Sequence, residues 1–158
     1  MAAATSSTDR TLALPERPVV TWLRMVRVVN RTQRAAADQF SAWGLSAAQF
    51  DVLAQLGASQ GPSQMELATR LLVTQGNVCQ LLDGMEKKGL VERRREGRTN
   101  HIFLTPAGRE LAIDVVPEHE TWQAERMAAL DDEEQRQLAR LLRKLDRAQV
   151  EAEVAATA

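Results

Sequence analysis

Residues 63–105 read SQMELATRLLVTQGNVCQLLDGMEKKGLVERRREGRTNHIFLT, and this stretch decides the fold. Ser63 and Glu66 have the S-x-x-E spacing of a capping box, so a helix is predicted to begin directly after Ser63. The link from Leu72 to a second helix at Thr74 is very short, which is typical of a helix-turn-helix. A helix upstream, beginning near Ser46, would complete a small three-helix core.

The second helix of this stretch is predicted over 74–88. Thr74 is a suitable N-cap, and Gly89 would end the helix as a C′ residue. Its apolar stripe has a 3.6-residue period and consists of Val78, Leu81, Leu82 and Met85. The outward residues are Gln75, Gly76, Asn77, Gln80 and Lys87. Asn and Gln amides donate and accept at once, as the edge of adenine requires, so this face, with Thr74, is predicted to contact DNA.

A β-hairpin is predicted after Gly89, because the apolar period there changes from 3.6 to 2. Strands are expected over 90–93 and 101–104, joined by residues 94–100, with Gly97 able to adopt positive φ at the tip. Residues 87–109 contain seven Lys and Arg against two Glu, a net of +5 in a chain whose total is −1. Such concentrated positive charge attracts phosphate. The predicted DNA contacts of this wing are Arg94, Arg95, Arg98 and Thr99.

The remaining segments are predicted to be long helices around this motif. A helix with apolar residues on one side and arginines on the other is expected over about 19–43. Thr105 should cap a further helix, which Pro117 should kink or interrupt. A last helix beginning at Asp131 carries a leucine stripe that would remain exposed to water unless another helix packs against it. The predicted fold class is therefore mainly α, with a small two-to-three-stranded β wing.

Four segments together resemble the MarR family of bacterial transcription regulators. They are LSAAQFDVL at 45–53, ELATRL at 66–71, LLDGMEKKGLVERR at 81–94 and LTPAGREL at 104–111. The resemblance covers roughly residues 20–148. It implies a homodimeric repressor that binds a pseudopalindromic operator on double-stranded DNA. It also implies release of the DNA by a small aromatic ligand or an oxidant.

The resemblance also assigns roles to single residues. Arg98 matches the wing arginine that enters the minor groove, and Glu96 stands where the family usually has Asp. Asp83 matches an acidic position that pairs toward the wing instead of meeting a base.

The division of the chain that follows has five parts. A disordered tail is expected over 1–17, a dimerisation helix over 18–44 and the winged helix-turn-helix over 45–105. C-terminal dimerisation helices are expected over 106–150 and a tail over 151–158.

Two features bear on regulation. Trp22, Phe40, Trp43 and His119 are candidates for a ligand pocket between the DNA-binding and dimerisation regions, although aromatic residues at helical spacing are more often core. Cys79 flanks the predicted DNA-binding helix, and its oxidation could shift that helix. The simpler interpretation of Cys79 is a small buried residue.

The sequence argues against enzymes and membrane proteins. It has two histidines, one cysteine, no tyrosine, and no metal-ligand, G-x-S-x-G or P-loop spacing, so neither a metal nor a cofactor is expected. Residues 1–15 lack the pattern of a signal peptide and no apolar run could cross a membrane, so a cytoplasmic protein is expected. Two alternatives remain open: a PadR-like or other winged-helix regulator, and a helical module that binds an acidic protein through the basic hairpin.

Overall fold

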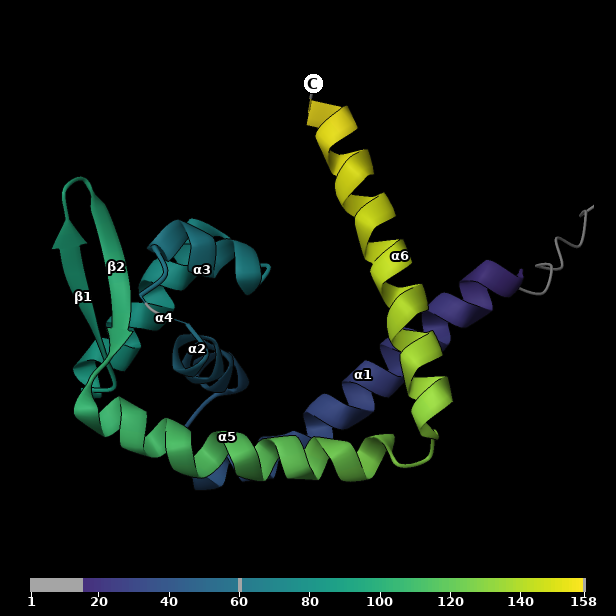
Figure 1. Ribbon diagram of the computed structural model, residues 1–158, viewed down its shortest axis with the longest axis horizontal. Coiled ribbons are helices and arrows are strands. Elements are labelled where there is room, and N and C mark those ends of the chain that lie inside the picture. The colour runs from purple at the N-terminus through teal and green to yellow at the C-terminus, as the bar shows by residue number, and fades with distance from the viewer. Residues whose placement is uncertain (1–15, 60, 158) are drawn as a thin grey trace, which may run out of the picture. The chain divides into compact units, whose positions relative to one another are not determined.

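The computed structural model describes residues 16–59 and 61–157, and it is mainly helical with one small sheet (Figure 1). The elements in chain order are α1 (Arg17–Ala42), α2 (Ala47–Gly57), α3 (Gln64–Arg70), α4 (Gln75–Lys87), β1 (Val91–Glu96), β2 (Thr99–Leu104), α5 (Pro106–Met127) and α6 (Asp132–Thr157). The chain forms two compact units, the first reaching Ala48 and the second beginning at Gln49. The predicted fold class is confirmed.

Helix α1 makes up most of the first unit. It begins at Arg17, close to the predicted start, with Pro18 in its first turn, where a missing N–H costs no hydrogen bond. Its buried residues are Ala36 and Phe40, near its C-terminal end. Its N-terminal half exposes an apolar stripe, which consists of Val19, Trp22, Leu23, Val26 and Val29. The predicted N-terminal tail lies outside the described residues except for its last two positions.

The core of the second unit is built from α2, α3, α4 and the sheet. Its fully buried side chains come from all of these elements: Val52, Leu53, Leu67, Val78, Leu82, Met85 and Ile102. The three predicted helices therefore do share one core. Lys88 Nζ donates to Gln49 Oε1 at 2.9 Å, which joins the end of α4 to the start of α2.

The helix-turn-helix begins and ends as its sequence predicts. Ser63 and Glu66 form a reciprocal capping box at the start of α3. The Thr74 side chain accepts from the Asn77 N–H at 3.3 Å and caps α4. Gly89 follows α4 with φ +68°, the conformation of a C′ glycine. The turn between the helices contains Leu72 at φ +53°.

The hairpin is tighter than predicted. Strands β1 and β2 pair antiparallel from Val91 opposite Leu104 to Glu96 opposite Thr99, so only Gly97 and Arg98 form the tip. The prediction of a seven-residue loop is therefore wrong, because Arg94, Arg95 and Thr99 lie on strands. The flanking charged residues extend the ladder because their side chains stay in water while their backbone groups pair. Gly97 has φ +63°, as its place at the tip requires.

A short third segment lies along β2, which agrees with the predicted two to three strands. Ser63 forms an isolated bridge with His101, and the Ile102 N–H donates to the Pro62 carbonyl at 3.0 Å. Gly61 has φ +60°, which favours glycine, and a Cβ there would lie 2.2 Å from the Phe103 ring and displace it.

Thr105 joins the end of α4 to the start of α5. Its hydroxyl donates to the Gly89 carbonyl at 2.6 Å and accepts from the Gly108 N–H at 3.0 Å. Its backbone N–H donates to the Leu90 carbonyl at 3.1 Å. A Cβ on Gly108 would lie 1.9 Å from the Leu90 oxygen, so the backbones of α5 and the α4–β1 link are in direct contact.

The C-terminal helices extend further than the sequence indicates. The interruption predicted at Pro117 is absent, because α5 continues to Met127, while a kink there stays a prediction. The hydrogen bond that Pro117 cannot donate would go to Ile113, which lies on the exposed side, where water can solvate the carbonyl. Helix α6 extends into the tail expected over 151–158, because it runs to Thr157.

Candidate nucleic-acid interface

Helix α4 presents a polar face at its N-terminal end. Val78, Leu82 and Met85 hold the opposite face in the core. The six predicted contact residues of this helix are all exposed: Thr74, Gln75, Gly76, Asn77, Gln80 and Lys87. Nothing lies within 4 Å of a Cβ placed on Gly76, so packing within the chain does not require glycine there. The geometry thus leaves amide side chains and an accessible backbone at the end of α4.

The wing arginines differ in what they contact. Arg94 forms an ion pair with Glu92, and its guanidinium lies 4.6 Å from the centre of the Phe103 ring. Arg95 Nε donates to the Gly97 carbonyl at 3.2 Å. Arg98 is exposed at the tip and forms no hydrogen bond or ion pair with a described residue. Arg98 is therefore the wing guanidinium most available to a phosphate or a groove.

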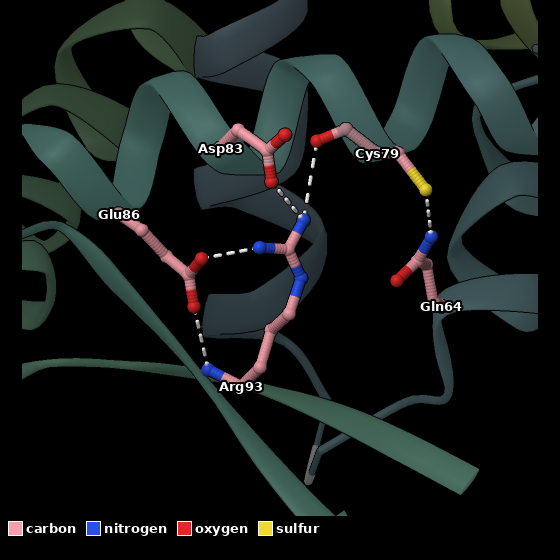
Figure 2. A network of polar contacts seen from close by, with 5 residues as sticks. All are labelled: Gln64, Cys79, Asp83, Glu86 and Arg93. Atoms are coloured by element: carbon pink, nitrogen blue, oxygen red, sulfur yellow. Dashed lines mark hydrogen bonds and ion pairs between the residues drawn. The ribbon is translucent and has the colours of Figure 1, made fainter.

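Arg93 connects the wing to α4, as Figure 2 shows. Its guanidinium pairs with Asp83 Oδ1 at 2.7 Å and with Glu86, and it donates to the Cys79 carbonyl at 3.1 Å. The Arg93 backbone N–H also donates to Glu86 Oε1 at 3.0 Å. The implied pairing of Asp83 toward the wing is thus present. These contacts fix the angle between β1 and α4, and they withdraw one cation from the predicted phosphate-binding charge.

Cys79 is exposed, so the interpretation of this residue as a buried cysteine is wrong. Gln64 Nε2 lies 2.6 Å from Cys79 Sγ, which connects the start of α3 to α4 (Figure 2). Val78, one residue earlier, takes the buried position of this turn, because the side chains of neighbouring helical residues point about 100° apart.

The four aromatic candidates for a ligand pocket lie in both units. In the first unit, the rings of Phe40 and Trp43 are 6.0 Å apart, and Trp22 is exposed. In the second unit, His119 is buried and stacks on Trp122 at 5.2 Å, with its ring edge-to-face against Phe50 at 4.6 Å. His119 therefore has the contacts of a core residue within its unit.

Burial sets the ionisation of His119 and of its acidic neighbour. Desolvation lowers the pKa of His119, while Asp51 raises it and Arg126 lowers it further. Desolvation raises the pKa of Asp51, and His119 opposes that effect.

The second unit contains a cavity between the end of α2, the end of β2 and α5. Its volume is about 450 Å³. The lining is mostly apolar, with Ala54, Leu104 and Val116 among its residues, and it includes the charged residues Arg109 and Glu120. None of the four predicted aromatic residues lines this cavity. No periodic pattern in the sequence indicates this cavity, because its walls come from three separate elements.

Other kinds of site find no support in the part of the chain that the structure describes. No cluster of three or more His, Cys, Asp or Glu residues suits a metal ion within residues 16–59 and 61–157. None of the described helices has both the length and the hydrophobicity needed to span a bilayer.

Comparison with known proteins decides the family. A family model described as MarR family matches residues 43–99. An HTH-type transcriptional regulator of Bacillus cereus is 34% identical over 125 residues, which cover 78% of this chain and 85% of that protein. The chain belongs to the MarR family. It is therefore a helix-turn-helix, DNA-binding transcriptional regulator and not an enzyme, and the MarR match argues against the PadR-like alternative.

Solved MarR-family structures have the same fold. A regulator from Silicibacter pomeroyi is 28% identical, with a TM-score of 0.69 over 80% of this chain and 86% of that one. MepR of S. aureus, in a structure of its complex with DNA, is 23% identical. Its TM-score is 0.74, over 85% of this chain and 99% of MepR, and at this identity the likeness supports the fold alone.

Sequence reasoning missed the role of Arg93 in this MarR-family chain. The alternation of β1 could have revealed it, because Arg93 lies two residues after the buried Val91 and so on the same side of the strand. The total charge of the hairpin hid this difference between neighbouring arginines.

Proposed function

We propose that this regulator is a homodimeric repressor that binds a pseudopalindromic operator. Helix α4 of each subunit would enter the major groove, with Gln75, Asn77 and Gln80 at base edges. Thr74, Gly76 and Lys87 would approach the backbone. The wing would follow the adjacent minor groove through Arg98, with Arg95 and Thr99 beside it. Arg94 is a weaker candidate than the sequence indicates, because Glu92 and Phe103 already engage its guanidinium.

One observation carries this proposal: a capped, exposed polar end of α4 lies in the same unit as a wing tip whose Arg98 pairs with none of the described residues. Amide side chains supply base discrimination, while the guanidinium supplies affinity that decreases with salt. MepR, which has this fold, has been solved in complex with DNA.

The apolar stripes of the long helices support a dimer. Helix α1 exposes the stripe described above, and α6 exposes Leu141, Leu142 and Leu145 on one face. A second copy would remove these side chains from water, which stabilises the assembly. We place the dimer in the cytoplasm, where a bacterial operator is accessible.

Selection of bound duplexes from a random pool tests operator binding. The expected result is an inverted repeat with half-sites about one helical turn apart, roughly 10 base pairs. Sedimentation of the protein with the selected duplex should give two subunits per operator. Enrichment of no sequence at physiological salt would contradict the proposal.

We further propose that a small aromatic ligand releases the DNA by entering the 450 Å³ cavity of the second unit. The apolar walls would hold a ring, and Arg109 at the lining would pair with an acidic substituent. Titration of the operator complex with aromatic carboxylic acids tests this. Release that Arg109→Gln weakens would support the assignment, whereas equal release from both proteins would exclude Arg109 from the ligand site.

A further inference from the structure

Leu72 is the C′ residue that ends α3, and its high exposure leaves the choice of a leucine at this position unexplained by packing. Its φ of +53° is the only positive φ of a non-glycine residue in the described ranges, and its side chain is 89% exposed. L side chains rarely adopt this left-handed conformation, and glycine or asparagine adopts it more readily. A leucine held there in water gains neither burial nor a favourable backbone conformation.

Two further apolar side chains of the helix-turn-helix are exposed. Met65, in the first turn of α3, is 63% exposed, and Val73, which follows Leu72, is 39% exposed. We call Met65, Leu72 and Val73 the turn patch. Thr74, the cap of α4, follows the patch directly, so the patch is continuous with the exposed end of the proposed recognition helix.

The backbone of the turn cannot act as a phosphate-binding loop. The Leu72 N–H donates to the Thr69 carbonyl at 3.2 Å, and the Val73 N–H donates to the Ala68 carbonyl at 3.1 Å. Both amides are thus used within the protein. Any contact from this turn to a partner must come from its apolar side chains.

We propose that Leu72, with Val73 beside it, contacts the C5-methyl group of a thymine in each operator half-site. This inference rests on the proposed function, which brings the N-terminal end of α4 to the base edges. In the major groove, the thymine methyl is the apolar group that distinguishes the base pairs. Three side chains are too few for a protein partner, since a stable interface uses roughly 20–30 residues a side.

The test replaces single thymines of the selected operator by deoxyuridine, which removes only the methyl group. Affinities of the full-length protein are measured by fluorescence anisotropy for the wild type, Leu72→Gly and Leu72→Asn. Both replacements tolerate positive φ, so thermal unfolding should show a fold at least as stable as the wild type. Val28→Ala on α1 is the matched control for loss of an exposed aliphatic side chain, because Val28 is 63% exposed and lies outside the apolar stripe of that helix.

One thymine per half-site should respond, with wild-type affinity falling about fourfold for the loss of one buried methyl. Leu72→Gly and Leu72→Asn should each bind the two operators equally, and Val28→Ala should behave as the wild type. The inference is overturned if no thymine replacement lowers the affinity of the wild type more than that of the Leu72 variants. A turn patch that binds a protein would give this result, with the same DNA affinity for the wild type and the variants. Selection that yields no operator would overturn the proposed function as well, so the two failures are distinguishable.

Discussion

Replacing Arg93 by methionine should separate the wing from α4 without removing the packing of its aliphatic stem. Arg93 is 20% exposed and holds two carboxylates and one carbonyl of α4. Methionine keeps the length of the stem but forms none of these contacts. The bond from the backbone N–H of residue 93 to Glu86 remains, so strand β1 itself should persist.

The expected loss follows from the exposure of each partner. Asp83 is 58% exposed, so solvent screens its ion pair to a few tenths of a kcal/mol, whereas Glu86, at 33%, should contribute about 1 kcal/mol. The hydrogen bond to the Cys79 carbonyl adds about 1 kcal/mol. The sum is about 2 kcal/mol, which lowers Tm by roughly 4–8 °C in a chain of 158 residues.

Thermal unfolding followed by circular dichroism measures this change. Arg95→Met is the matched control, because Arg95 is on the same strand but exposed, with its head group bound only to the hairpin tip. It should change Tm by less than about 2 °C, as expected of an exposed residue. A Tm for Arg93→Met within 1 °C of the wild type, or a loss no larger than that of the control, would refute the assignment of Arg93 as the link between wing and helix.

Four further outcomes are expected. Arg98→Ala should weaken operator binding and reduce the salt slope by about 1, and gel-shift titration at several salt concentrations measures both. Gln80→Ala should alter the preferred sequence more than the salt slope, and equal loss on specific and random DNA would contradict this. Gly76→Ala should raise stability by up to about 1 kcal/mol yet weaken DNA binding, because a methyl group would separate the backbone from the phosphate. Burial depresses the pKa of His119 below its ordinary value of 6.5, so protons bind His119 more strongly in the unfolded chain than in the folded one. Tm should therefore fall as pH drops below about 6.5, and His119→Phe should reduce this dependence of Tm on pH.

Local signals predicted most of the fold, because caps and periodicity act within a few residues. The capping box at Ser63, the cap at Thr74 and the stop at Gly89 are all present in the structure. Pro117 shows where local rules fail: it removes one hydrogen bond, but α5 continues through it. The sequence pattern also underestimates the length of the two strands, because charged residues can take part in a β-ladder through their backbone groups.

The candidate site was predictable in its composition but not in its internal pairing. The sequence shows that arginines gather in the hairpin. The structure shows that Arg93 pairs with Asp83, while Arg98 forms no hydrogen bond or ion pair with a described residue. The 450 Å³ cavity and the strained turn at Leu72 depend on tertiary packing and on backbone conformation, which no residue pattern in this chain encodes.

Thr105 holds the segment between α4 and α5 in one conformation. Its hydrogen bonds to Gly89, Leu90 and Gly108, and the backbone contact at Gly108, join the end of one helix closely to the start of the other. A twist of α5 about its own axis must therefore carry the C-terminal end of α4 with it. Under the proposed function, substitutions along α5 can therefore change operator preference without any contact between the substituted residues and a nucleotide.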